Sequence, residues 1–74
     1  MSEQNVQSVD RALSILTLLA KSRAPLGPTS LANQLTLPKS TVHRLLTTLD
    51  KSAFVDRSPG GQYRVGAALR ALRH

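Results

Sequence analysis

The segment LANQLTLPKSTVHRLLTTL, residues 31–49, contains two apolar stripes of helical period that are separated by a short break. The break is Thr36-Leu37, which we expect to form a tight turn between two helices. Ala32 is a small residue of the kind that lets a second helix cross the first at close range. Five further positions supply the apolar contacts that would hold the crossing together: Leu31, Leu35, Leu37, Val42 and Leu45. The segment therefore predicts a helix-turn-helix.

The residues that flank the turn set the bounds of these two helices. Pro28 suits the first turn of a helix, where its missing N–H has no helical partner to lose, so the first helix is predicted over Pro28–Leu35. The second helix is predicted over Pro38–Lys51, with a length of about 20 Å at roughly 1.5 Å per residue. Its one-sided apolar stripe consists of Val42, Leu45, Leu46 and Leu49.

Another amphipathic helix is predicted ahead of this motif, over Ser8–Lys21. Ser8 can cap its start, and Asp10 places a negative charge in the first turn, where its interaction with the helix dipole is favourable. Ile15 and Leu18 lie outside the main apolar face and widen it, which indicates burial on two sides. The main face consists of Val9, Ala12, Leu13, Leu16, Leu19 and Ala20.

After Ser52 the pattern changes from helical to extended. Strands are predicted over Ala53–Arg57 and Gln62–Val65, because Ser58-Pro59-Gly60-Gly61 between them is a strong turn signal. Tyr63 and Val65 would face one side of the second strand, and Gln62 and Arg64 the other. A last helix is predicted over Ala67–Arg73. The sequence thus predicts a mainly α fold with a small β-hairpin, a winged helix-turn-helix.

Size and composition restrict the class of protein. The 74 residues suffice for one small domain with a thin core, and 41% of them are hydrophobic, as in ordinary globular proteins. No apolar run approaches the roughly 20 residues that span a bilayer. The segment Met1–Gln7 has no Lys or Arg and so lacks the basic start of a secretory signal. The absence of cysteine excludes disulfides and thiolate metal sites. We expect a cytoplasmic protein.

The positive charge is distributed unevenly along the chain. The formal net charge is +6, with three basic and two acidic residues in 1–37 and seven basic and two acidic residues in 38–74. A small domain with its charge in one half suits a polyanion, because neutralised phosphates release counterions. The other interpretation is a charged surface that only keeps the protein in solution. Charge alone leaves both open.

The predicted second helix of the motif presents side chains suited to reading DNA. With its apolar stripe turned inward, its outward residues are Lys39, Ser40, His43, Arg44 and Thr47. Arg44 can donate two hydrogen bonds to a guanine edge, and Ser40, Thr41 and Thr47 can contact bases, thymine methyls or phosphates. His43 can donate to a base or a phosphate. Lys39 suits a phosphate, as do the free N–H groups at the start of each helix.

The hairpin adds Arg57, Gln62 and Arg64, which we expect to lie along the DNA backbone or in the minor groove. Arg57 and Arg64 could instead form only a solvated charged face. Ser40 and Thr41 could equally cap the helix rather than contact DNA.

No enzyme is expected. Ser40 and His43 lie one helical turn apart, but no carboxylate or oxyanion donor accompanies them, so they do not suit a hydrolase. His43 has no Cys or His partner nearby, and we expect neither a metal nor a cofactor.

Three motifs in order resemble the IclR (isocitrate lyase regulator) family. VQSVDRAL at 6–13, followed by Ile15-Leu16, is similar to the family's opening. LPKSTVHRLL at 37–46 resembles its recognition helix almost residue for residue. FVDR at 54–57, the Gly60-Gly61 turn and YRVG at 63–66 resemble its wing. The resemblance extends from about Val6 to Leu72, and the three motifs together are highly specific.

This resemblance implies the DNA-binding domain of a prokaryotic transcription regulator, either a repressor or an activator. It implies dimers, often paired into tetramers, on palindromic or pseudo-palindromic sites. It also implies that a linker helix follows Gly66 and leads to an effector-binding domain that this sequence lacks, as a truncated chain would. The expected organisation is a flexible tail at 1–7, the winged helix-turn-helix at 8–65 and the start of the linker helix at 66–74. This fragment alone is expected to be a monomer or a weak dimer.

The sequence departs from the family pattern in the turn and the helix before it. Thr36 stands where the family often has Gly, and Gly27-Pro28, Asn33 and Gln34 are also unusual there. A Thr with positive φ would be strained, so these changes put the turn geometry in question. The alternative function is a winged-helix module that binds another protein, for which Leu69 and Leu72 on the last helix could serve.

Overall fold

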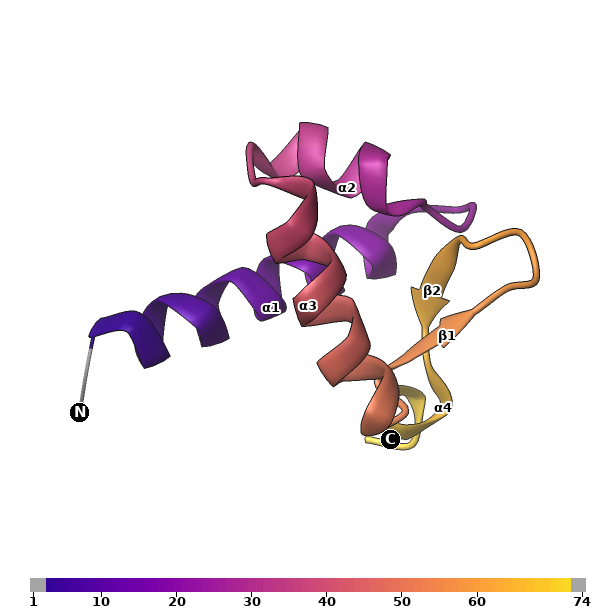
Figure 1. Ribbon diagram of the computed structural model, residues 1–74. Coiled ribbons are helices and arrows are strands. Elements are labelled where there is room, and N and C mark those ends of the chain that lie inside the picture. Colours follow the sequence, from indigo (N-terminus) through magenta and orange to yellow (C-terminus); the bar gives the residue numbers. More distant parts are fainter. Residues whose placement is uncertain (1–2, 73–74) are drawn as a thin grey trace.

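The computed structural model describes residues 3–72, which form four helices and a two-stranded antiparallel sheet. The elements are α1 (Glu3–Lys21), α2 (Pro28–Leu35), α3 (Lys39–Lys51), β1 (Val55–Arg57), β2 (Tyr63–Val65) and α4 (Ala67–Arg70). In Figure 1, α3 crosses in front of α1, α2 lies at the top, and the hairpin lies on the right. The expected winged helix-turn-helix fold is confirmed, and α2 has the bounds predicted for it.

A single apolar core joins the three long helices to the hairpin. Five of its side chains are fully buried, at roughly 1.5–3 kcal/mol of stabilisation each: Ile15, Leu31, Val42, Leu46 and Val55. Ala32 is also buried, as expected of the small residue where the two helices of the motif cross. Among the described residues no polar or charged side chain is buried. Polar chemistry therefore lies on the surface.

The first helix differs from its prediction. It begins at Glu3, so Ser8 is an exposed residue inside the helix and the expected cap at Ser8 is wrong. Residues 3–7 contain no Gly or Pro that would stop a helix, and they continue α1 instead of forming a separate tail. Met1 and Ser2, the rest of that expected tail, lie outside the described residues.

The apolar face predicted for this helix is correct only in its second half, and even there Ala20 is exposed. Leu16 and Leu19 are buried and Ile15 is fully buried, but Val9 and Leu13 are 58% and 55% exposed. The reason is visible in Figure 1, where the N-terminal half of α1 extends beyond the other elements. A helical pattern marks an apolar face, but burial requires a neighbouring element to cover it.

The turn between α2 and α3 has the strained geometry that its sequence suggested. Thr36 has φ 55° and ψ 48°, in the left-handed region, and its N–H donates to the carbonyl oxygen of Ala32. The Leu37 N–H donates to the same oxygen at 3.0 Å. Because a β-branched residue rarely adopts positive φ, this turn is held by the packing around it at a cost of order 1 kcal/mol.

The hairpin is shorter than predicted because a turn follows α3. Ala53 has φ 60°, and the Phe54 N–H donates to the Leu49 carbonyl at 2.9 Å, so β1 begins only at Val55. A close approach fixes this turn: a Cβ added to Gly66 would lie 2.4 Å from the Ala53 carbonyl oxygen. The second strand begins at Tyr63 rather than Gln62.

A contact outside the hairpin holds the wing against the helices. Leu26, between α1 and α2, pairs with Tyr63 as an isolated antiparallel bridge. The Leu26 N–H donates to the Tyr63 carbonyl at 2.9 Å, and the reverse bond measures 2.7 Å. At the other end of the hairpin, α4 extends only from Ala67 to Arg70 and residues 71–72 form a turn, so the predicted end at Arg73 lies outside the described residues.

Candidate nucleic-acid interface

The face of α3 that points away from the core is polar and exposed. It carries all five outward residues predicted for it, and each is exposed: Lys39, Ser40, His43, Arg44 and Thr47. Thr41 is only half-buried, because it lies toward α1 rather than on the outer face. Sequence reasoning missed Lys51, which is exposed on the same helix face, four residues after Thr47 and seven after Arg44.

The charged groups of this face are available for a ligand. The ion pair formed within the described residues joins Arg70 to Asp56, with Nη2 and Oδ2 3.5 Å apart, and does not involve α3. Arg44 therefore presents its planar guanidinium group to solvent without a carboxylate among the described side chains. A guanidinium in this state can make the paired hydrogen bonds that a guanine edge or a phosphate accepts.

The hydroxyl groups on α3 are not all equivalent. Thr47 Oγ1 donates to the His43 carbonyl at 2.9 Å, and Thr48 Oγ1 donates to the Arg44 carbonyl at 3.1 Å. Each of these threonines therefore offers a methyl group and oxygen lone pairs outward, and its proton is used within the helix. Thr47 is thus suited to contact a thymine methyl or a hydrogen-bond donor.

The start of α3 is open to an anion. Its cap position is occupied by Pro38, and no side chain caps the helix, so the alternative role of Ser40 and Thr41 as caps is not what the structure contains. The first N–H groups of a helix have no helical acceptor and attract negative charge. With Lys39 and Ser40 both exposed beside them, this end of the helix suits a phosphate group.

The three wing residues are exposed but do not share one face of the hairpin. Arg57 lies opposite Tyr63 and Arg64 opposite Asp56, and directly paired residues point to the same side of a sheet. Arg64 and its neighbour on the same side, Gln62, therefore lie on one face, and Arg57 lies on the other. All three nevertheless line one hollow of about 240 Å³ beside the tip of the hairpin.

A hollow of about 420 Å³ lies between α3 and the projecting half of α1. It brings together residues that are more than 30 positions apart in sequence, and Arg11 of α1 and Arg44 of α3 both line it. Its other lining residues are Ser8, Val9, Ala12, Thr41, Leu45 and Thr48. Sequence reasoning did not select Arg11, because only the crossing of α1 and α3 places it here.

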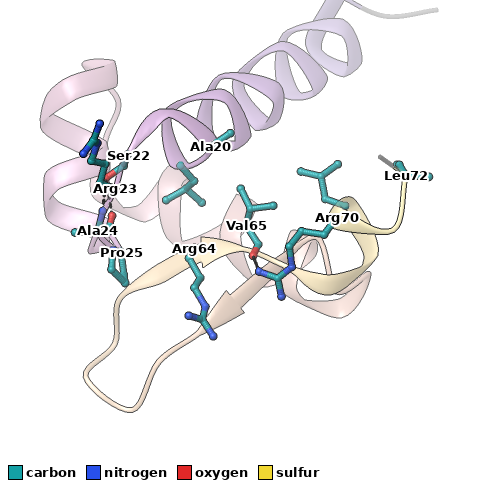
Figure 2. Close-up of a pocket in the computed structure, with 11 residues that line it drawn as sticks. Ala20, Ser22, Arg23, Ala24, Pro25, Arg64, Val65, Arg70 and Leu72 are labelled. Atoms are coloured by element: carbon teal, nitrogen blue, oxygen red, sulfur yellow. Dashed lines mark hydrogen bonds between the residues drawn. The ribbon is translucent and has the colours of Figure 1, made fainter. Parts of the chain in front are cut away.

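A second hollow, of about 520 Å³, lies at the other end of α1, between the 22–25 connection, β2 and α4 (Figure 2). Its arginines do not converge on a common point: Arg23 and Arg64 extend in different directions. Arg70 is engaged within the fold, because its Nη1 donates to the Val65 carbonyl at 3.1 Å and its Nη2 faces Asp56. The polar groups around this hollow therefore do not form a binding site like that of α3.

The chain is similar to known regulators along most of its length. Residues 8–59 match the family model of the IclR helix-turn-helix domain. The glycerol operon regulatory protein of Streptomyces griseus is 41% identical over 70 residues, which are 93% of this chain and 28% of that protein. The transcriptional repressor IclR of Escherichia coli is 45% identical over 64 residues, which are 84% of this chain and 23% of that protein.

Solved structures agree with the fold described above. An IclR transcriptional regulator from Alicyclobacillus acidocaldarius superposes with a TM-score of 0.83 and 32% identity, over 89% of this chain and 27% of that one. The repressor BlcR of Agobacterium tumefaciens gives a TM-score of 0.78 and 37% identity, again over 89% and 27%. The chain thus spans about a quarter of the length of these relatives.

The site and the comparisons lead to the same family. No helix within residues 3–72 is both long and apolar enough to cross a membrane. The exposed basic and hydroxyl-bearing face of α3, the helix pair that supports it and the match over residues 8–59 all lie in one domain. The chain belongs to the IclR helix-turn-helix family of transcription regulators, and it is a DNA-binding domain.

Proposed function

We propose that this domain recognises a specific sequence of double-stranded DNA by placing α3 in the major groove. The observation that carries the proposal is the outer face of α3, where Arg44 stands exposed and without a carboxylate partner among described side chains. At 13 residues the helix is about 20 Å long, which suits a groove roughly 12 Å wide. Arg44 reads a guanine, and Ser40, His43 and Thr47 contact neighbouring base edges.

The proposed phosphate contacts come from α3 itself and from the wing. Lys39, Lys51 and the free N–H groups at the start of α3 bind the backbone next to the groove. The wing binds through Arg57 or through Arg64 and Gln62, on the backbone or in the minor groove. Thr41 supports the start of the helix and contacts a phosphate from its half-buried position.

Binding to another protein is the weaker candidate. A face that docks on a protein partner is enriched in aromatic and other apolar residues. The exposed residues of α3 are instead Lys, Ser, His, Arg and Thr, with one Asp at position 50. No catalytic role is proposed, and the relatives of this chain are named as regulators.

The proposal extends to two copies on a palindromic or pseudo-palindromic operator. Val6, Val9 and Leu13 lie on one side of the projecting half of α1 and are 57%, 58% and 55% exposed. An exposed apolar stripe on a helix is stabilised when a second helix covers it. Two half-sites one helical turn of DNA apart would then fit the two copies of α3.

The whole regulator is proposed to act in the cytoplasm, where prokaryotic DNA lies. Since the relatives are about four times as long as this chain, a small-molecule effector would act through a further domain, and the start of a linker helix at 66–74 would lead to it. The domain organisation, with the DNA-binding part at 8–65, is part of the same proposal.

The test is selection of bound duplexes from a random pool at near-physiological salt. We expect enrichment of a palindrome or of one repeated half-site. The enriched duplex is then titrated with the 74-residue chain. We expect a higher affinity than for random duplex, and an affinity that decreases as the salt concentration rises. Equal binding to both sequences at every salt concentration would contradict sequence recognition.

A further inference from the structure

We infer that Arg11, on the projecting half of α1, is an additional DNA contact that binds a backbone phosphate beside α3. This inference rests on the proposed function, because α3 fixes where the duplex lies. The wing and the N-terminal half of α1 lie on opposite sides of α3 in Figure 1. Arg11 would therefore hold the DNA strand on the flank that the wing does not reach.

The first support is the position of Arg11 in the hollow between α1 and α3. Arg11 and Arg44 line the same hollow, so the α1 arginine lies at the edge of the reading face. Arg11 is half-buried, whereas Arg44 is exposed. In a half-buried arginine the methylene groups pack against the protein and the guanidinium group stays in water. This packing restricts the directions in which the guanidinium group can point.

The second support is the charge of this hollow. Two arginines line it, and no acidic residue does among those whose side chains the structure describes. Asp10 is adjacent to Arg11 in sequence, but it lies on another side of the helix and lines a different hollow with Leu13 and Lys21. The single ion pair among the described residues is elsewhere, between Asp56 and Arg70. Two like charges with no carboxylate between them are stabilised by an incoming anion.

The third support is the hydroxyl-bearing rim. Ser8 of α1 and Thr41 of α3 also line the hollow, and both can donate to an oxygen anion. Guanidinium and hydroxyl donors around one hollow match the oxygens of a phosphate diester. Contacts of this kind fix the position of a protein on the duplex and carry no sequence information, so Arg11 orients α3 while Arg44 reads the base.

The experiment compares Arg11→Gln with Lys21→Gln, which removes the same charge from the exposed far end of α1. Affinity is measured for the selected duplex and for a random duplex over a series of salt concentrations. For Arg11→Gln we expect a several-fold loss that is equal on the two duplexes, and a decrease of about 0.9 in the slope of log K against log salt. Lys21→Gln should change the slope by much less.

A second measurement uses duplexes in which single phosphates are replaced by neutral methylphosphonates. The wild type should lose affinity at a phosphate on the α1 flank, and Arg11→Gln should be insensitive at that phosphate. If Arg11→Gln fails to fold, as judged by circular dichroism, the wild-type methylphosphonate series decides alone, and affinity that is unchanged at every phosphate on the α1 flank would overturn the contact.

The possible results separate this inference from the proposed function. A wild type without any sequence preference would overturn both. A wild type with a clear preference, together with an Arg11→Gln variant whose affinity and slope match those of Lys21→Gln, would overturn the Arg11 contact alone. A loss confined to the selected duplex would also overturn it, because that result indicates a base contact.

Discussion

The helix pair α2–α3 and the first helix α1 show how differently similar apolar patterns are used. Along α3 the pattern and the burial largely agree: Val42 and Leu46 are fully buried, Leu49 nearly so, and Leu45 half-buried. Along α1 the same kind of pattern is buried only at its C-terminal end, and Leu13 stays more than half exposed. The helices α2 and α3 pack against each other within a segment of 24 residues, 28–51, whereas the burial of α1 depends on elements that are distant in sequence.

The largest expected effect is a difference in stability between the same Leu-to-Ala substitution made in α3 and in α1. Leu46→Ala should lower the free energy of unfolding by about 2–5 kcal/mol, because it leaves a cavity at a fully buried position. Leu13→Ala should change it by less than about 0.5 kcal/mol, since that side chain is 55% exposed. Urea denaturation of both variants measures the difference. Similar losses would mean that the projecting half of α1 is covered in solution.

The next prediction concerns a contact between distant parts of the chain. Gly66→Ala should destabilise the domain by about 1–3 kcal/mol, because the new Cβ would lie 2.4 Å from the Ala53 carbonyl oxygen and the turn before β1 would have to shift. Gly60→Ala at the hairpin tip is the control, since its nearest neighbour would be Ser58 Oγ at 3.9 Å. If the thermal melting curves of the two variants coincide, the backbone around Gly66 moves to accept the new Cβ without a loss of stability.

A third prediction compares α3 with the wing. Arg44→Ala should cost about 1–3 kcal/mol on the selected duplex and little on random DNA, because it removes a base contact. Arg64→Ala should weaken both duplexes to the same extent, because a wing arginine contacts the backbone. Fluorescence anisotropy titrations distinguish the two patterns. Equal losses for Arg44→Ala on both duplexes would assign Arg44 to a phosphate.

The smallest expected effect lies in the turn of the helix pair. Thr36→Gly should raise the free energy of unfolding by about 0.5–1 kcal/mol, since glycine adopts φ 55° without the penalty of a β-branched residue. The gain is limited because glycine also has more freedom in the unfolded chain. Chemical denaturation with Thr36→Ala as a control measures it. A loss of stability with Gly would mean that the Thr36 side chain contributes contacts that outweigh the strain.

The parts of the fold that were predictable are those determined by local sequence. Pro28 and the apolar spacing placed α2 correctly, and the stripe of α3 placed its outer residues on the exposed side. Lys51 could have been found from the same helical spacing. The short β1 could not, because the left-handed Ala53 is stabilised by its approach to Gly66, which is distant in sequence.

The candidate site was predictable to the same degree. Helical geometry alone was enough to select Arg44 and its neighbours. It could not select Arg11, because that residue enters the site only when α1 crosses α3, nor could it show that Arg57 and Arg64 lie on opposite faces of the hairpin. The contacts that each of these residues makes with DNA stay predictions.

The bridge between Leu26 and Tyr63 has a consequence for how this domain can vary in length. An isolated two-stranded hairpin is marginally stable in water, and this bridge gives β2 a neighbour on its other edge. Residues inserted into the 58–61 tip would lengthen the wing without moving its base. Residues inserted between Lys21 and Leu26 would shift the base itself, and with it the spacing between the wing and α3. Insertions should therefore be tolerated at the tip and excluded from the connection that precedes α2.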